Sequence, residues 1–180
     1  MNKRDDILQA AEKLFYTHGF HPTSTDQICA AARVSTRTFY RYFPSREMLT
    51  KCVMEERQTR FFGDLHPSDH PQAVNKLFAV LEKWMSEQGA LGCFFAKAWG
   101  EYAEQDALLA ARALDFRYAI RDYIAACIAQ RFKTSDDSLA NAIWMLFEGA
   151  VTAAVIQGSA TAFQAEQAAA LLMNIQEKQL

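Results

Sequence analysis

Basic and aromatic side chains alternate in a short segment, VSTRTFYRYFPS, from Val34 to Ser45. Between positions 33 and 51 the chain has five Lys or Arg residues and one acidic residue, Glu47. Guanidinium and ammonium groups bind anions, and tyrosine hydroxyls donate hydrogen bonds to them. We therefore expect a small anion-binding face here, although the net charge of the whole chain is only −2.

Two short helices are predicted to hold these side chains. Ser24 is suited to be an N-cap and has Gln27 at capping-box spacing, so a helix should follow it to about residue 33. Ser35 should cap a second helix that runs to about Phe43. Two short helices joined by a tight turn form a helix-turn-helix, whose second helix enters the major groove of DNA. This spacing alone is weakly specific, because many helical bundles contain short turns.

The whole chain is predicted to be all-α, with about nine helices. Apolar residues make up 51% of it, Gly and Pro are few, and strand-like alternation is lacking. A polar loop is expected from Gly63 to Pro71. The segment from residue 138 to 165 has one charged residue, Glu148, so a helix there must be covered on nearly all sides. Its Gly, Asn and Gln residues disfavour a membrane span.

The segment from His18 to Val53 resembles the DNA-binding region of the tetracycline-repressor (TetR) family of bacterial transcription regulators. The residues that carry the resemblance are Gly19, Thr23-Ser24, Ile28, Ala31, Val34-Ser35, Thr38-Phe39-Tyr40, Tyr42-Phe43 and Ser45-Arg46-Glu47. Arg33 departs from the pattern, because the family usually has glycine at this point of the turn. If the turn needs a left-handed residue, arginine costs about 1 kcal/mol there.

The resemblance implies three functional parts. These are a three-helix DNA-binding domain with the helix-turn-helix in residues 1–47, a connecting helix in 48–65, and a helical ligand-binding and dimerisation domain in 66–180. It also implies a homodimer through the last two helices, a near-palindromic double-stranded DNA operator, and release by a small hydrophobic or aromatic ligand. No cofactor and no membrane partner are expected. The N-terminus does not resemble a signal peptide, so we expect a cytoplasmic protein.

Helix spacing places Phe39 and Phe43 on an inner face of the second short helix, and the resemblance implies that its outer residues contact DNA. Arg37 could bond a guanine bidentately, and whether Arg37 or Arg41 reads bases stays open. Tyrosine hydroxyls and the start of the first short helix are expected to hold phosphates. The expected DNA contacts are Thr23, Ser24, Thr25, Arg33, Thr36, Arg37, Thr38, Tyr40, Arg41, Tyr42, Arg46 and Lys51. The alternative is that these tyrosines are packing residues and the arginines form a solvated face.

The middle of the chain is rich in aromatic residues, which are candidates for the ligand pocket that the resemblance implies. The expected lining is Phe78, Trp84, Phe95, Trp99, Tyr102, Phe116, Tyr123, Trp144 and Glu148. Glu101, Arg117 and Arg121 could supply further polar anchors. Most of the aromatic residues are expected to be core packing, and Glu148 could equally be a paired carboxylate.

Other classes of function stay open on the sequence. Cys93 follows Gly92 at the expected start of a helix, where a thiolate is favoured, so a regulator triggered by oxidation or alkylation is an alternative. A helical interaction protein without DNA binding is a more distant one. An enzyme is disfavoured, because the chain has no nucleophile motif or phosphate loop. The four cysteines have no C-x-x-C spacing, which disfavours a metal site.

Overall fold

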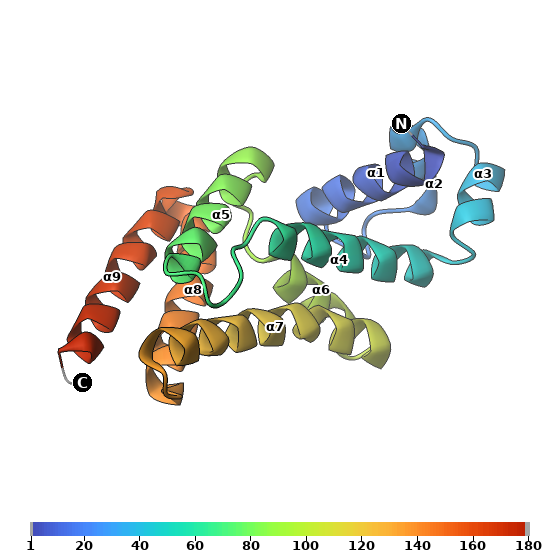
Figure 1. The fold of residues 1–180 in the computed structure, drawn as a ribbon. Helices are drawn as coiled ribbons and strands as arrows, with labels where there is room; N and C mark the ends of the chain where they lie inside the picture. The colour runs from blue at the N-terminus through green and yellow to red at the C-terminus, as the bar shows by residue number, and fades with distance from the viewer. Residues whose placement is uncertain (1, 179–180) are drawn as a thin grey trace. The chain divides into compact units, whose positions relative to one another are not determined.

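The computed structural model describes residues 2–178 (Figure 1). Its helices are α1 (Lys3–His18), α2 (Thr25–Ala32), α3 (Thr36–Tyr42), α4 (Arg46–Gly63), α5 (Ala73–Gln88), α6 (Phe94–Tyr102), α7 (Ala107–Phe132), α8 (Asp137–Gln157) and α9 (Ala160–Glu177). Residues 2–178 thus contain nine helices and no strand. The prediction of an all-α chain with about nine helices is confirmed.

The helices pack as two compact units. Unit 1 comprises Met1–Arg60 and Phe94–Phe116, and unit 2 comprises Phe61–Cys93 and Arg117–Leu180. Unit 1 therefore takes in α6 as well as the N-terminal helices, although α5 lies between them in the sequence. The predicted parts 1–47, 48–65 and 66–180 were defined by function and not by packing, so they stay a prediction.

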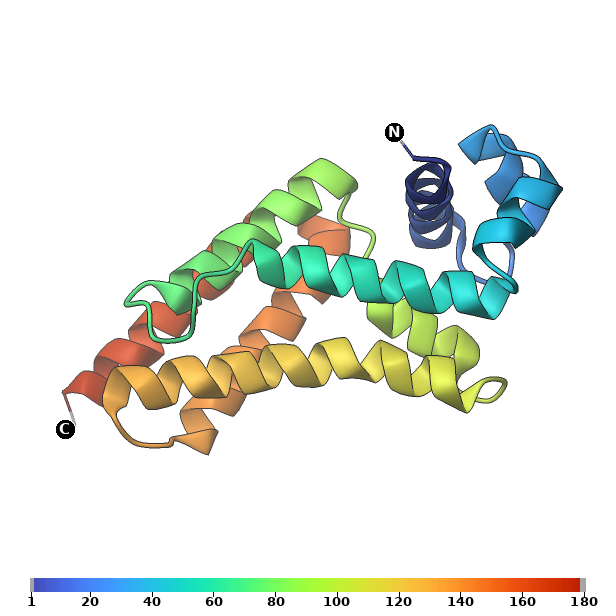
Figure 2. The ribbon, with the colours of Figure 1, turned by 45° about the vertical axis from the view of Figure 1, so that its right-hand side comes forward.

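In unit 1, α3 comes directly before the N-terminal end of α4, α1 lies beside α4, and α2 packs against α1 (Figures 1 and 2). Their core consists of fully buried apolar side chains such as Ile7, Phe15 and Ile28. The carboxylate of Glu12 on α1 accepts hydrogen bonds from Arg57 and Arg60 on α4, so the two helices are also joined by ion pairs.

In unit 2, α8 and α9 pack along one another, and α5 packs against α9. The hydroxyl of Thr161 on α9 donates to the carbonyl of Ala150 on α8 at 2.9 Å, and both residues are buried. By length and composition α8 is able to cross a membrane, but core helices of globular proteins share that property.

Candidate nucleic-acid interface

Two capped helices form the helix-turn-helix. Ser24 begins α2, because its Oγ accepts from the N–H of Gln27 at 3.2 Å while the Gln27 side chain accepts from the N–H of Ser24 at 2.7 Å. Ser35 begins α3, and its Oγ accepts from the N–H of Thr38 at 3.1 Å. Both predicted N-caps are confirmed.

The turn between these helices runs through Arg33, which has left-handed backbone angles of φ 53° and ψ 48°. Its N–H donates to the carbonyl of Ala30 at 3.2 Å, and the next N–H, of Val34, donates to Cys29 at 3.0 Å. This conformation favours glycine, and an arginine holds it at a cost. The turn thus needs a left-handed residue, a point that the sequence left open, and arginine stands there in the place of the family's glycine.

The two faces of α3 differ as we predicted. Phe39 and Phe43 are 0% and 1% exposed, so they fix the helix to the core of unit 1. Tyr40 is 50% exposed, and Arg37 and Arg41 are exposed beside it. A solvent-facing surface of aromatic and guanidinium groups can contact phosphates and base edges together.

Arg41 is held by a neighbouring ring. Its guanidinium carbon lies 4.9 Å from the centroid of Tyr42, and its Nη2 donates to the Tyr42 hydroxyl at 3.4 Å. Arg37, in the first turn of α3, has no ion-pair or hydrogen-bond partner among the described residues. The two arginines therefore differ in freedom, which bears on which of them reads bases.

Two of the expected DNA contacts are placed differently from the others. Thr23 is 1% exposed, and its hydroxyl donates to the carbonyl of Gly19 at 2.7 Å, so it is not presented to solvent. Arg46 donates to the carbonyl of Phe20 and lies over the ring of Phe15 at 5.8 Å. Its charge helps to hold the loop between α1 and α2.

The remaining expected contacts lie at the surface of unit 1. Ser24, Thr36 and Lys51 are exposed, and Thr25 and Thr38 are half-buried. Lys51 is also 3.8 Å from Glu55, one helical turn away, which is a weak surface pair. Their role as DNA contacts stays a prediction.

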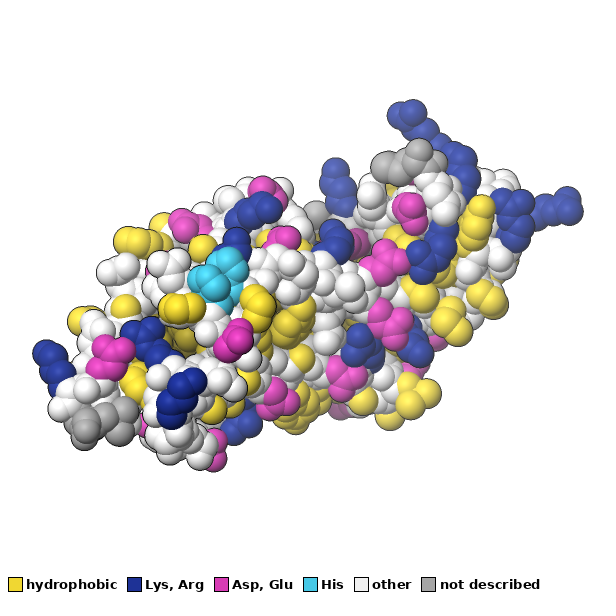
Figure 3. Space-filling model, viewed as in Figure 1, with side chains coloured by type: hydrophobic (Ala, Val, Ile, Leu, Met, Phe, Trp, Pro, Cys, Tyr) yellow, Lys and Arg dark blue, Asp and Glu magenta, His cyan; other side chains and the backbone are white. Residues whose placement is uncertain are grey.

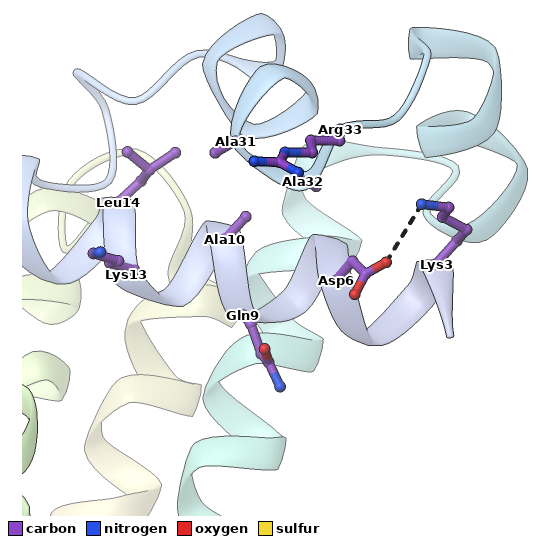
Figure 4. Close-up of a pocket in the computed structure, with 9 residues that line it drawn as sticks. All are labelled: Lys3, Asp6, Gln9, Ala10, Lys13, Leu14, Ala31, Ala32 and Arg33. Atoms are coloured by element: carbon purple, nitrogen blue, oxygen red, sulfur yellow. Dashed lines mark ion pairs between the residues drawn. The ribbon is translucent and has the colours of Figure 1, made fainter. Parts of the chain in front are cut away.

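A groove of about 610 Å³ lies between α1 and the C-terminal end of α2 (Figure 4). Lys3, Lys13 and Arg33 line it, and its acidic residue, Asp6, is 3.6 Å from Lys3. Lys and Arg side chains also stand out around the N-terminal helices in Figure 3. Lys3 and Lys13 were not predicted from the sequence, because they are far in sequence from the basic residues of positions 33–51. Only the packing of α1 against α2 brings them near Arg33.

The expected ligand-binding residues divide between the two units. Phe95, Trp99, Tyr102 and Phe116 belong to unit 1, where the rings of Phe95 and Phe116 stack at 4.2 Å. Of these four, Trp99 is 45% exposed and the other three are buried. This is the core packing that we expected for many of the aromatic residues.

The other expected ligand-binding residues lie in unit 2. Phe78 is fully buried, and Trp84 donates from Nε1 to Asp64 at 3.1 Å. The hydroxyl of Tyr123 donates to the carbonyl of His66 at 2.7 Å, and burial raises the pKa of this tyrosine. These side chains are engaged within unit 2, and their role in ligand binding stays a prediction.

Glu148 is a paired carboxylate. Arg117 donates to it from Nε at 3.1 Å and from Nη2 at 2.6 Å, which is a bidentate geometry. On the same helix, Nε1 of Trp144 is buried without a hydrogen-bond partner among the described residues. A buried indole N–H of this kind is a donor available to an acceptor group of a ligand.

The cysteines differ in environment. Cys93 is half-buried and lies directly before α6, as expected, and its role as a sensor stays a prediction. Cys29 and Cys127 are buried, and burial raises the pKa of Cys127 to about 11. Among residues 2–178, no cluster of three His, Cys, Asp or Glu side chains is arranged to hold a metal ion.

The comparisons with known proteins find similarity to transcriptional regulators. Residues 7–51, which contain the whole helix-turn-helix, match the family described as bacterial regulatory proteins, tetR family. The HTH-type transcriptional regulator UidR of Escherichia coli is 37% identical over 57 residues, which are 32% of this chain and 29% of UidR. The HTH-type transcriptional repressor NicS of Pseudomonas putida is 35% identical over 83 residues, which are 43% of this chain and 39% of NicS. The matches thus span about a third of these relatives' length.

The likeness to solved structures extends over nearly the whole chain. A TetR-family transcriptional regulator from Streptomyces coelicolor superposes with a TM-score of 0.79 at 21% identity, covering 96% of this chain and 94% of that one. At this identity the likeness establishes the fold. The helix order beyond residue 51 is therefore that of the solved structure, while the match to the family model is confined to residues 7–51.

Proposed function

We infer that this chain, which belongs to the tetR family of bacterial regulatory proteins, is a transcriptional regulator that binds double-stranded DNA through α2 and α3. The observation that carries this is α3 itself, because Phe39 and Phe43 anchor it while Arg37, Tyr40 and Arg41 face solvent. The family consists of regulators and not of enzymes, in agreement with the sequence prediction.

The two arginines of α3 have separate roles in this proposal. Arg37 reads base edges in the major groove, because it lies in the first turn of the helix and is not engaged by another described side chain. Arg41 contacts a phosphate together with Tyr42, because the ring contact fixes its guanidinium beside the tyrosine hydroxyl. Ser24 and Thr25 at the N-terminus of α2 hold a further phosphate.

We propose that regulation is repression, since NicS, which is similar to this chain over 83 residues, is a repressor. The free protein then occupies a near-palindromic operator in the cytoplasm, and a small ligand shifts the population toward a form that no longer fits both half-sites. The buried Nε1 of Trp144 favours a ligand that has a hydrogen-bond acceptor as well as an apolar body.

A second copy of the chain is the proposed partner of α8 and α9. Met145 and Ile156 on α8 are 61% and 88% exposed and lie eleven residues apart, which is three helical turns and hence one face. Phe163, Leu171 and Ile175 on α9 are each more than half exposed. Apolar surface of this extent calls for a partner, and a symmetric dimer would present two recognition helices to one operator.

The DNA-binding proposal is tested by selecting bound duplexes from a random pool and measuring binding to the selected and to a random duplex. Arg37→Ala should lower affinity for the selected duplex more than for the random one, because a base contact is lost. Tyr42→Phe should weaken both alike, because a phosphate contact is lost. Tyr118→Phe removes a hydroxyl from a 61% exposed tyrosine of α7 and is the control. Equal losses for Arg37→Ala and Tyr42→Phe on both duplexes would contradict the assignment.

The dimer is tested by sedimentation. Ile156→Glu should convert the dimer to a monomer, because it buries a charge in the proposed interface. The matched control is Leu108→Glu on α7, where the side chain is 85% exposed but lies outside α8 and α9. A wild-type protein that sediments as a monomer at micromolar concentration refutes the proposed dimer.

A further inference from the structure

The loop between α1 and α2 is held by a carboxylate from α6. Glu101 accepts from the N–H of Phe20 through Oε1 at 2.8 Å and from the N–H of His21 through Oε2 at 2.6 Å. The imidazole Nδ1 of His21 is 3.3 Å from the same Oε2. Two consecutive backbone N–H groups on one carboxylate form an anion-binding nest, and bonds to a charged acceptor are stronger than neutral ones.

The backbone of the loop is shaped to admit this carboxylate. Gly19, with φ +94°, comes directly before the two donating N–H groups, and a Cβ at Gly19 would lie 2.9 Å from Oε1 of Glu101. Real Cβ atoms do not approach an oxygen so closely, so any other residue would push the carboxylate or the loop aside. The glycine that ends α1 thus has a second role, because it leaves room for Glu101.

Both polar backbone groups of Phe20, its N–H and its carbonyl, are hydrogen-bonded to charged side chains. Glu101 takes its N–H, and Arg46 at the start of α4 donates to its carbonyl. The side chain of Phe20 is fully buried, with its ring 5.0 Å from that of Phe94 and 5.7 Å from that of Tyr102, both on α6. The loop is therefore locked by two charged side chains and by the aromatic face of α6.

The locked loop leads directly into α2. The hydroxyl of Thr23 donates back to the carbonyl of Gly19 at 2.7 Å, and the N–H of Thr23 donates to Phe20 at 3.3 Å. The next residue, Ser24, is the N-cap of α2. Only Pro22 and Thr23 lie between His21 and the N-cap. The nest around Glu101 therefore sets the position of the N-terminus of α2, where we propose that a phosphate binds.

We propose that Glu101 is a positioning residue of the DNA-binding surface, which it preorganises by holding the α1–α2 loop without touching DNA. The proposal rests on the proposed DNA-binding function. Without the carboxylate the loop samples other conformations, and only the fraction with α2 in place binds, so the apparent dissociation constant rises by the inverse of that fraction. Because α6 supplies the carboxylate, a shift of α6 would change DNA affinity through this contact.

The test compares two charge-neutralising variants on the duplex selected from the random pool. Glu101→Gln keeps one acceptor oxygen but turns an amide N–H₂ toward a backbone donor, so one bond and the charge are lost. The matched control is Glu104→Gln, an exposed residue three positions on, in the turn after α6. Simple electrostatics predicts that removing an acid leaves DNA binding unchanged or tightens it in both variants. The positioning role predicts that Glu101→Gln alone weakens binding, by about tenfold.

Binding by Glu101→Gln that is as tight as that of the wild type overturns the proposal, and so does equal weakening in both variants. Amide hydrogen exchange of the wild type gives a second measurement that needs no variant to fold. Phe20 and His21 should be protected in the free protein, and protection that develops only when DNA is added overturns the proposal. A wild type that selects no duplex refutes the proposed function instead, while the exchange of these two amides still reports on the nest.

Discussion

The left-handed turn residue of the helix-turn-helix allows stability and DNA binding to be separated with one substitution. Arg33→Gly keeps the backbone conformation, which glycine adopts freely, and removes the guanidinium from the groove beside α1. The left-handed conformation costs a non-glycine residue roughly 1–2 kcal/mol. Glycine loses about 0.5–1 kcal/mol more conformational freedom on folding. The difference predicts a variant about 0.7 kcal/mol more stable than the wild type.

The expected effect on DNA binding has the opposite sign. If Arg33 neutralises one phosphate, its loss makes the slope of log affinity against log salt less negative by about 0.9. If the wild type and the variant bind equally at 1 M salt, this difference in slope makes the variant's affinity about fivefold lower at 0.15 M salt and about fifteenfold lower at 0.05 M salt. The variant should therefore melt about 2 °C higher and yet bind DNA less tightly.

Lys133 provides a control with the same backbone geometry. It is the other non-glycine residue with positive φ among those described, at 58°, and it follows α7 in unit 2. Lys133→Gly should raise the melting temperature by a similar amount, because it relieves the same strain, and should leave the salt slope unchanged. Binding is measured by fluorescence anisotropy at several salt concentrations, and melting by circular dichroism. A salt slope for Arg33→Gly equal to that of the wild type would refute the phosphate contact, whatever the melting temperature.

Two further predictions concern unit 2. The side chains of the bidentate pair Arg117–Glu148 are 29% and 19% exposed. A double-mutant cycle of Arg117→Met and Glu148→Gln, measured by urea unfolding, should give a coupling free energy of about 1 kcal/mol. A coupling near zero would show that the pair does not stabilise the unit. Cys127, whose pKa burial raises to about 11, should be about one part in a thousand thiolate at pH 8. Alkylation by iodoacetamide should accelerate about tenfold per pH unit up to that pKa, and equal rates for Cys127 in folded and urea-unfolded protein would contradict its burial.

The local part of the interface could be predicted from the sequence. The caps at Ser24 and Ser35 depend on residues within three positions, and the inward face of Phe39 and Phe43 follows from helical spacing. Such features are encoded in a few neighbouring residues, and the structure confirms them.

The contacts that failed to emerge from the sequence are those made across the fold. Arg46 resembled another phosphate contact, but its acceptor lies 26 residues away on Phe20. Glu101 resembled a ligand anchor, but its two backbone donors, Phe20 and His21, lie 81 and 80 residues away. Charge and spacing say what such a side chain can bind, and packing decides which partner it meets. For the same reason, helical spacing could not separate core aromatics such as Phe78 from residues that line a cavity.

The contact of α6 with the loop after α1 limits how this protein can be recombined. A chimaera could be made by joining the first helices of one such protein to the remaining helices of another. A junction after residue 60 would transfer Gly19, with its room for a carboxylate, but would leave Glu101 behind. The transferred segment would keep every proposed DNA contact and would still have two loop amides without their acceptor. A working exchange would have to move residues 94–116 together with residues 1–60, because unit 1 is discontinuous in sequence.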